Sequence, residues 1–185
     1  MTSGPLYTVG HSTRPFEIFL ELLQAHRIVK LVDVRSFPGS RRFPQFNRED
    51  LESLLEENGL SYYHLKELGG LRRKGDVASV NTAWKNESFR NYADYMQTAE
   101  FREGIDSLLR IAGDSRTVIM CAEAVPWRCH RQLISDYLVA LRGIEVFHII
   151  DASQLRQHTL TAFAQVEGET LIYPEEGPSG SRDKP

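Results

Sequence analysis

Short apolar runs alternate with longer amphipathic segments along most of the chain. Runs rich in Val, Ile and Leu without polar interruption are typical of strands that are buried on both faces of a sheet. They occur at residues 6–9, 31–34, 60–65, 117–121 and 146–150. The run at 117–121 is the most continuous and β-branched, so we expect it to lie at the centre of the sheet.

The segments between these runs carry apolar residues three and four positions apart, which predicts helices with one buried face. Pro15 and Pro126 are suited to a first helical turn, and Asn47 is suited to an N-cap. The five predicted buried faces are Phe16, Phe19, Leu20 and Leu23; Leu51, Leu54 and Leu55; Phe89, Tyr92, Ala93 and Met96; Phe101, Ile105, Leu108 and Leu109; and Leu133, Ile134, Tyr137, Leu138 and Leu141.

Strands that alternate with helices predict parallel pairing through right-handed crossovers. The expected fold class is therefore α/β, with three layers and a mainly parallel five-stranded sheet covered by helices on both faces. We expect residues 1–174 to form a single domain and residues 175–185, rich in Gly, Pro, Ser and charge, to be a disordered tail. Residues 72–87 predict a loop, residues 155–163 a short helix, and residues 171–173 a short strand.

Composition narrows the class of protein. The 185 residues are 41% hydrophobic and 25% charged, which is typical of a globular chain, and the net charge of -3 argues against a globally basic nucleic-acid-binding protein. No apolar run is long enough to span a bilayer, and residues 1–11 lack the apolar stretch of a secretory signal. These features predict a cytoplasmic protein without a membrane partner, whose two cysteines are reduced.

Polar and small residues follow each predicted strand. Because parallel α/β sheets bind ligands outside the carboxyl ends of their strands, we expect these residues to converge on one site. A helix predicted to begin near Arg128 adds its free N–H groups to the same edge. The residues are His11, Asp33, Arg35, Gly69, Gly70, Cys121, Glu123, Cys129, His130 and Arg131.

Structural roles compete with functional ones at several of these positions. Asp33 could pair with Arg35, and Gly69 and Gly70 could supply the positive φ of a turn, which is the favoured role for these glycines. Cys129 is an even choice between a packing residue and a thiol whose pKa is lowered by neighbouring cations.

Two predicted loops are basic and contain aromatic residues. Grouped guanidinium groups beside a helix N-terminus suit phosphate or another polyanion. The aromatic residues could stack on bases, although anchoring the loops is the favoured role. The basic residues are Arg35, Arg41, Arg42 and Arg48, then Lys66, Arg72, Arg73 and Lys74; the aromatic residues are Phe37, Phe43, Phe46 and Trp84.

Four sequence blocks together resemble a known family. They are residues 7–13 (YTVGHST), residues 32–35 (VDVR) with Pro38 and Ser40, Tyr63 followed by residues 68–70 (LGG), and Cys121-x-Glu123 leading to residues 129–131 (CHR). The blocks resemble those of the domain of unknown function 488 family. The resemblance implies a bacterial or archaeal intracellular protein with a compact α/β fold, from a family without a firmly assigned reaction.

The leading functional hypothesis is an enzyme that acts on an anionic substrate, such as a nucleotide or another phosphate-bearing compound. Cys129 is the candidate nucleophile, Glu123 or His11 the proton-transfer group, and Asp33 a further catalytic candidate. The expected substrate-binding residues are Arg35, Gly69, Gly70, Cys121, His130 and Arg131.

Two other functions remain open. The first is a divalent metal site, with zinc ligands Cys121, Cys129 and His130, although the spacing matches no recognised zinc motif. The second is a nucleic-acid-binding module that uses the basic loops without catalysis. A phosphatase-like anion loop between Cys121 and Arg128 has one residue too many for the usual spacing. The sequence predicts no oligomeric state.

Overall fold

The main sheet has six strands in the order β3-β2-β4-β1-β5-β6, in a computed structural model that describes residues 4–175. The α/β class is confirmed, but the sheet has six strands rather than the expected five. Strands β1 to β5 are parallel neighbours, and β6 runs antiparallel to β5. The strands are β1 (Leu6–Gly10), β2 (Lys30–Asp33), β3 (Ser61–His64), β4 (Thr117–Cys121), β5 (Val146–Ile149) and β6 (Leu155–Gln157).

Strand β4 lies between β2 and β1 and is buried along its whole length, as its β-branched sequence predicts. Tyr7 pairs with Val118 on one side, and Leu31 pairs with the same residue on the other. A strand hydrogen-bonded on both edges and covered on both faces exposes no surface to water, which explains its uninterrupted apolar run.

The helix expected at residues 155–163 is wrong, because this segment provides β6 instead. The carboxylate oxygen Oδ1 of Asp151 accepts hydrogen bonds from the backbone N–H groups of Ser153 and Gln154, at 2.8 and 2.9 Å. Such a turn reverses the chain, and His148 then pairs with Arg156. The short strand expected at 171–173 is confirmed as β8 (Thr170–Ile172), which pairs with β7 (Gln165–Glu167) in a separate hairpin.

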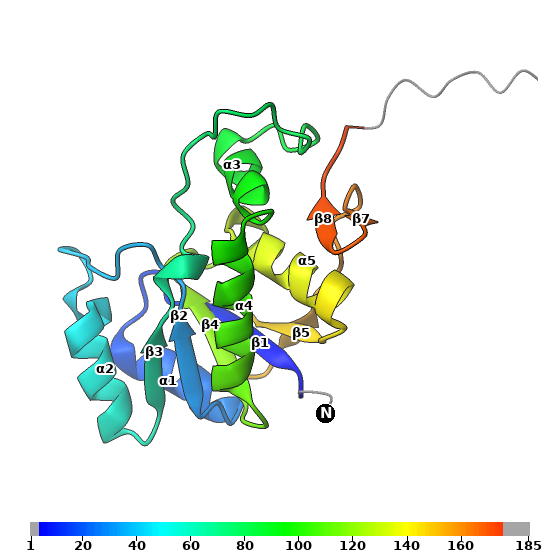
Figure 1. The fold of residues 1–185 in the computed structure, drawn as a ribbon. Coiled ribbons are helices and arrows are strands. Elements are labelled where there is room, and N and C mark those ends of the chain that lie inside the picture. Colours follow the sequence, from blue (N-terminus) through cyan, green and yellow to red (C-terminus); the bar gives the residue numbers. More distant parts are fainter. Residues whose placement is uncertain (1–3, 176–185) are drawn as a thin grey trace, which may run out of the picture.

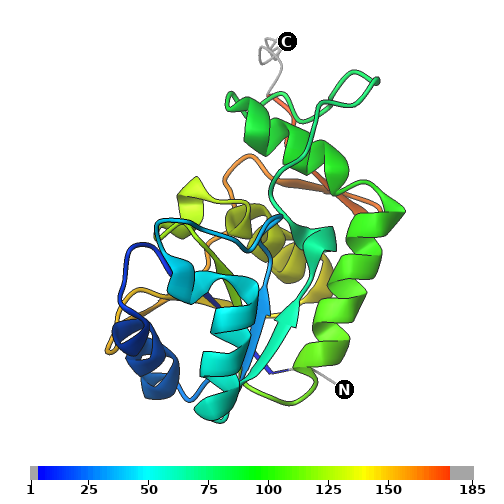
Figure 2. The same ribbon diagram turned by 90° about the vertical axis from the view of Figure 1, so that its left-hand side faces the viewer.

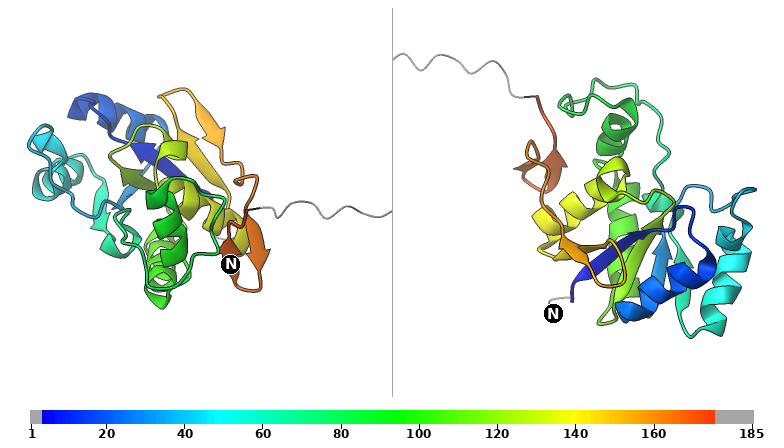
Figure 3. Two further views of the ribbon diagram at one scale, coloured as in Figure 1. Left: turned by 90° about the horizontal axis from the view of Figure 1, so that it is seen from above. Right: turned by 180° about the vertical axis from the view of Figure 1, so that it is seen from behind.

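Helices cover both faces of the sheet (Figures 1 and 3). One face carries the first two helices, which pack with Phe46 against the sheet, and the other face carries the remaining three. The helices are α1 (Phe16–Ala25), α2 (Arg48–Glu57), α3 (Glu87–Tyr95), α4 (Ala99–Ala112) and α5 (Arg131–Arg142). No helix within residues 4–175 combines the length and apolar character that crossing a bilayer requires.

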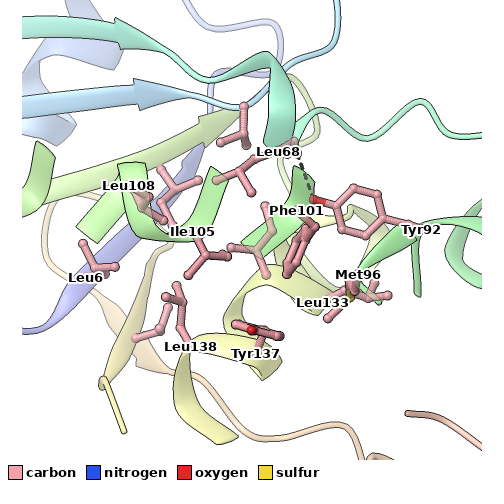
Figure 4. Close-up of a cluster of buried hydrophobic side chains, with 14 of the residues drawn as sticks. Leu6, Leu68, Tyr92, Met96, Phe101, Ile105, Leu108, Leu133, Tyr137 and Leu138 are labelled. Carbon is pink, nitrogen blue, oxygen red and sulfur yellow. Dashed lines mark hydrogen bonds between the residues drawn. The ribbon is translucent and has the colours of Figure 1, made fainter. Parts of the chain in front are cut away.

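The core beneath α3, α4 and α5 joins aromatic and aliphatic side chains from all three helices (Figure 4). Phe101 meets the ring of Tyr137 edge to face, with ring centroids 5.0 Å apart. The hydroxyl of Tyr92 donates to the backbone carbonyl of Leu68 at 2.9 Å. This bond ties α3 to the loop after β3, so the hydrophobic core also fixes a loop at the carboxyl edge of the sheet.

One expected helix start differs from the observed one, and one expected cap lacks its side-chain hydrogen bond to the helix. Residues 126–128 form a single 3-10 turn, Cys129 is extended (φ -135, ψ 153), and α5 begins only at Arg131. The helix start expected at Pro126 is therefore wrong, because the backbone of Cys129 leaves the helical region. Asn47 occupies the N-cap position of α2, but its side chain accepts a hydrogen bond from the backbone N–H of Ser40 (2.6 Å) rather than from the helix.

The chain leaves the adjacent strands β1 and β4 toward opposite faces of the sheet, since α1 belongs to one core and α5 to the other. A crevice opens at such a switch point outside the carboxyl ends of the strands. Figures 1 and 2 show α3 and the irregular segment before it, residues 72–86, beyond the arrowheads at this edge. The loop expected at 72–87 is confirmed in this position, although Glu87 is already the first residue of α3.

The division into one domain at residues 1–174 stays a prediction. The tail expected at residues 175–185 lies outside the described residues except for Glu175, whose carboxylate pairs with Lys85 at 2.7 Å.

Candidate functional site

Two adjoining clefts lie at the carboxyl edge of the sheet, with volumes of about 440 and 470 Å³. Arg35, Phe37, Ala122 and Glu123 line both of them. We call the first the thiol cleft, because Cys121 and Cys129 line it together with Gly70, Leu71, Phe89, Tyr92, Arg128 and His130. We call the second the histidine cleft, because His11 lines it together with Ser12, Ser40 and Phe43.

Arg35 is held by Asp33 at the boundary between the clefts. Its Nε donates to both carboxylate oxygens of Asp33, at 2.9 and 3.0 Å, and its Nη2 lies 2.5 Å from Oδ2. The hydroxyl of Tyr62 donates to the same Oδ2 at 2.8 Å. Asp33 is fully buried and lines neither cleft. Its geometry therefore suits orienting Arg35 rather than contacting a bound molecule.

His11 supports Arg35 from the other side. Its ring stacks on Phe46 with centroids 4.1 Å apart, and its Nδ1 donates to the carbonyl of Ser12 at 2.8 Å. The lone pair on Nε2 then faces Nη1 of Arg35 at 3.3 Å. Burial, with a smaller contribution from the Arg35 charge, lowers the pKa of His11 to about 4. His11 is therefore neutral at pH 7 and accepts a hydrogen bond from Arg35.

The two cysteines meet at the end of β4. Their Sγ atoms are 2.7 Å apart, and both residues are buried as free thiols. Nε of Arg131 donates to Sγ of Cys121 at 3.0 Å, and Nη2 donates to the carbonyl of Glu123. Arg131 is 1% exposed, and among the described residues no carboxylate forms an ion pair with it. The anion best placed to balance its charge is therefore a thiolate of this pair.

The pKa shifts of the two thiols have opposite directions. Burial alone would raise the pKa of Cys129, but the hydrogen bond from Cys121 and the neighbouring His130 and Arg131 together hold this pKa well below its ordinary value. Burial and the hydrogen bond to Cys129 raise the pKa of Cys121. These directions favour the thiolate at Cys129 and the protonated thiol at Cys121, an arrangement suited to nucleophilic attack.

His130 faces Cys129 and is fixed by the end of β2. Its Nε2 donates to the backbone carbonyl of Val34 at 2.9 Å, which leaves the lone pair of Nδ1 directed at Sγ of Cys129, 3.4 Å away. His130 can therefore take the proton of the Cys129 thiol. This contact depends on the extended backbone of Cys129, and the sequence pattern of a continuous helix did not predict it.

The two glycines after β3 permit close packing of loops, and neither has a positive φ. A Cβ on Gly70 would lie 2.5 Å from Nδ1 of His130, and a Cβ on Gly69 would lie 2.6 Å from Oγ of Ser36. Only Gly70 lines a cleft. The turn role that the sequence favoured is thus replaced by a packing role that keeps His130 beside Cys129. Gly10, which the sequence did not single out, likewise permits close packing, because a Cβ there would clash with the backbone of Glu123.

The basic and aromatic residues of the two loops divide between structural and exposed positions. Arg72 lies over the ring of Tyr95, 3.5 Å from its centroid, and donates to backbone carbonyls. Phe46 is fully buried and Trp84 is partly buried against Phe163, as the anchoring role predicts. In contrast, Phe37 is 77% exposed at the mouth of both clefts. The exposed basic residues of these loops are Arg41, Arg42, Arg48, Lys66, Arg73 and Lys74.

Glu123 lines both clefts on an exposed loop, and its carboxylate accepts a hydrogen bond from the N–H of Val125 at 3.3 Å. The sequence-predicted residues are therefore brought to one edge, but Asp33, Gly69 and Arg131 lie behind the surface of the clefts, so Arg131 does not have the substrate-contacting position expected of it. Within residues 4–175, no three His, Cys, Asp or Glu side chains are grouped as metal ligands. The expected ligand set Cys121, Cys129 and His130 does not form such a group.

A buried polar chain behind Arg131 was missed by the sequence reasoning. Nη1 of Arg131 lies 3.2 Å from Oγ1 of Thr8, which lies 2.7 Å from Nδ1 of His148. His148 continues to His158 at 3.0 Å, and His158 to Asp136 at 2.8 Å. Arginine can only donate and a carboxylate can only accept, so Thr8 accepts from Arg131 at one end of the chain and Asp136 accepts from His158 at the other.

His148 lies in the middle of this chain and is neutral. Burial, with the charge of His158 next, lowers the pKa of His148 to about 3, so this ring is uncharged at pH 7. The hydroxyl of Tyr173 donates to Oδ2 of Asp136 at 2.9 Å, which satisfies the second carboxylate oxygen. The sequence signal for this chain was the presence of polar residues among the buried positions of β1, α5 and β5.

The fold and the clefts define an α/β protein with a thiol pair at the switch point of a parallel sheet. The pattern of the family described as Domain of unknown function DUF488 matches residues 15–138. The chain belongs to this family, which confirms the resemblance seen in the sequence. No curated protein and no solved structure matches the chain.

Proposed function

We propose that this protein is an enzyme that binds an anionic substrate at the carboxyl edge of the sheet and attacks it with the Cys129 thiolate. The observation that carries the proposal is the buried Arg131 guanidinium, whose nearest anionic group is the thiol pair (3.0 Å to Cys121 Sγ). A buried cation without a carboxylate is costly unless another anion balances it. A stabilised thiolate at the wall of a cleft is the usual form of a cysteine nucleophile.

The cleft that holds the thiols suits a molecule with an anionic group and an apolar part. Arg35 and the exposed Arg128 contribute positive charge, while Phe37, Leu71 and Phe89 form apolar walls. A volume of about 440 Å³ is within the range that binds small molecules. A nucleotide or another phosphate-bearing compound has this combination of groups.

The other residues have supporting roles in this proposal. His130 accepts the thiol proton through Nδ1, and Gly70 leaves room for its ring. Asp33 and His11 orient Arg35. Glu123, on the exposed loop between the two clefts, is the carboxylate placed to exchange a proton with a bound substrate.

The test compares two alkylating agents that differ in charge. Iodoacetate is anionic and iodoacetamide is neutral, so the ratio of their rates at Cys129, divided by the same ratio for a small free thiol, reports anion binding. We expect this normalised ratio to exceed one and to fall in Arg128→Gln. The matched control is Arg110→Gln, an exposed arginine in the last turn of α4, at the opposite edge of the sheet.

Inorganic phosphate and nucleoside monophosphates should slow both reagents at Cys129. A normalised ratio that is the same in Arg128→Gln and wild type, without protection by any phosphate compound, would overturn the anionic substrate. Absence of alkylation at Cys129 in the folded protein would overturn the nucleophile.

A non-catalytic nucleic-acid-binding module is the second candidate. It is favoured by the exposure of Phe37 (77%) on the loop that also carries the exposed Arg41 and Arg42. Binding of single-stranded nucleic acid that weakens steeply with salt and is unchanged in Cys129→Ser would support this candidate over the enzyme.

A further inference from the structure

The two cysteines lie in direct contact, although a cysteine nucleophile needs no second thiol beside it. Cys121 ends β4, and Cys129 precedes α5, eight positions later, with their Sγ atoms 2.7 Å apart. A disulfide bond is about 2.05 Å long, so bond formation requires the sulfurs to approach by less than about 1 Å. A nucleophile that acts by hydrolysis has no use for a second thiol in this position, because that thiol competes with water for the covalent intermediate.

The surroundings of the two sulfurs differ in a way that orders their reactions. Both residues line the thiol cleft, at 6% exposure for Cys129 and 3% for Cys121. Cys121 is held from behind by Nε of Arg131, and its thiol also lies 3.7 Å from the carbonyl of Glu123. Cys129 faces His130 at the cleft side. Cys129 is the more exposed of the two and the one beside His130, so it is the attacking thiol, and Cys121 lies within reach of whatever bond Cys129 forms.

We propose that Cys129 and Cys121 form a thiol–disulfide exchange centre whose substrates are small disulfides that carry anionic groups. This inference rests on the proposed function, because it uses the same nucleophile and the same cleft. It adds the substrate class and assigns Cys121 as the resolving thiol.

The reaction balances in two steps. In the first, the Cys129 thiolate attacks one sulfur of R–S–S–R; the new bond joins Sγ of Cys129 to that sulfur, and R–S⁻ leaves with the electron pair of the broken bond. In the second, Cys121 attacks Sγ of Cys129, the internal disulfide forms, and the second R–S⁻ leaves. The proton that His130 took from Cys129 and the proton of the Cys121 thiol end on the two leaving groups. The protein pair loses two electrons and the small disulfide gains two, and the reverse steps use two R–SH molecules.

Arg131 sets the direction that exchange favours. Its guanidinium stabilises the thiol pair in the reduced state, where one sulfur carries negative charge, and it loses that partner when the disulfide forms. A dithiol stabilised in this way is a weaker reductant, and its disulfide is a stronger oxidant. At equilibrium with a small thiol and its disulfide, the protein should therefore favour the dithiol, more so than a variant without the arginine.

The experiment uses the full chain and three small disulfides of different charge. These are glutathione disulfide (anionic), 2-hydroxyethyl disulfide (neutral) and cystamine (cationic), with loss of free thiol and the mass of the intact protein as readouts. We expect wild type to lose two hydrogens and to retain no adduct. Glutathione disulfide should react about tenfold faster than cystamine, since opposite charge accelerates encounter with a basic cleft.

Two single variants separate the roles of the cysteines. Cys121→Ser should accumulate a stable mixed disulfide at Cys129, because no thiol resolves it, whereas Cys129→Ser should react more slowly at the less exposed Cys121. Arg131→Met should shift the glutathione equilibrium toward the protein disulfide. If this variant does not fold, the mixed disulfide of Cys121→Ser still tests the assignment.

The failure of this inference differs from the failure of the proposed function. A wild-type protein that keeps a mixed disulfide at Cys129 without forming the internal bond would overturn exchange while leaving Cys129 as a nucleophile. Equal rates with the three disulfides would overturn the anionic substrate class. Absence of any reaction, together with absence of alkylation at Cys129, would overturn both.

Discussion

The guanidinium of Arg131 contacts the thiol of Cys121 in the interior of the protein, with Nε 3.0 Å from Sγ. Arg131 comes from the first turn of α5 and Cys121 from the end of β4, so the contact joins the two elements that enclose the loop of residues 122–130. The position of this arginine thus couples the charge of the thiol pair to the polar chain that ends at Asp136.

Replacing Asp136 tests whether that polar chain stabilises the fold. Asp136→Asn leaves His158, Thr161 and Tyr173 with one acceptor oxygen in place of two. We expect the free energy of unfolding to fall by about 3 kcal/mol, because a buried donor that loses its acceptor keeps the full cost of its desolvation. Urea unfolding at pH 7 measures this change.

The control for Asp136 is Asp106→Asn, which removes a surface ion pair with Arg142 (2.6 Å). Exposed pairs of this kind contribute about 0.5 kcal/mol or less. Equal losses in the two variants would contradict a stabilising role for the buried chain.

Asp33 should matter more for stability than its neighbour Tyr62. Asp33→Asn leaves the buried Arg35 guanidinium without its counter-charge, and we expect a loss of about 3–5 kcal/mol in the free energy of unfolding. Tyr62→Phe removes one hydrogen bond to the same carboxylate, at a cost of about 2 kcal/mol. Chemical denaturation of both variants decides the order, and a Tyr62→Phe variant as unstable as Asp33→Asn would contradict the ion pair as the main contribution.

Gly70→Ala should displace His130. The added Cβ would lie 2.5 Å from Nδ1 of the imidazole, so the ring must move away from Cys129. We expect a loss of about 1–3 kcal/mol in stability, as for other overpacked sites, together with slower alkylation of Cys129. Gly75→Ala is the matched control, since nothing lies within 4 Å of its Cβ. Alkylation rates that are equal in the two variants would show that His130 does not assist the thiol.

His11 should make the fold less stable in mild acid. Its pKa is lowered from 6.5 to about 4, mainly by burial, so between these values the unfolded chain binds a proton that the folded protein does not. The stability that depends on a neutral His11 is fully present above pH 6.5 and is lost as the pH falls toward 4. The loss in the free energy of unfolding is about 2 kcal/mol at pH 4.5, after allowance for partial solvation. In His11→Gln, which retains an acceptor for Arg35, the difference in unfolding free energy between pH 7 and pH 4.5 should be smaller by that amount. An unchanged difference would contradict a neutral, buried His11.

The layered fold and the edge that carries the site were predictable from periodicity. The five parallel strands follow from apolar runs such as residues 117–121, because a strand buried on both faces cannot alternate with polar residues. The sixth strand was not predictable in this way. Residues 155–157 are exposed and carry no apolar pattern, and they become a strand only by pairing with β5 after the local turn at Asp151.

The candidate residues could be identified because they follow strands, but most of their roles could not be predicted. Strand ends such as Asp33 and Cys121 converge in any parallel sheet, whereas the pairing of Asp33 with Arg35 depends on side-chain orientation. The roles of Gly70 and His130 could not be predicted without knowing how close their two loops lie in the folded protein. The polar chain through His148 and His158 joins strands that are neighbours only after folding, and single-sequence periodicity contains no such information.

The most direct test of a reactive thiolate is the rate at which Cys129 is alkylated by iodoacetamide in the folded protein and in the same protein unfolded in urea, both at pH 6.5 and in the Cys121→Ser background. A buried structural thiol is protected by folding, whereas a thiolate stabilised by Arg131 and His130 reacts faster when the fold holds those groups beside it. We predict faster alkylation in the folded state; slower alkylation in the folded state than in the unfolded state would contradict Cys129 as the nucleophile.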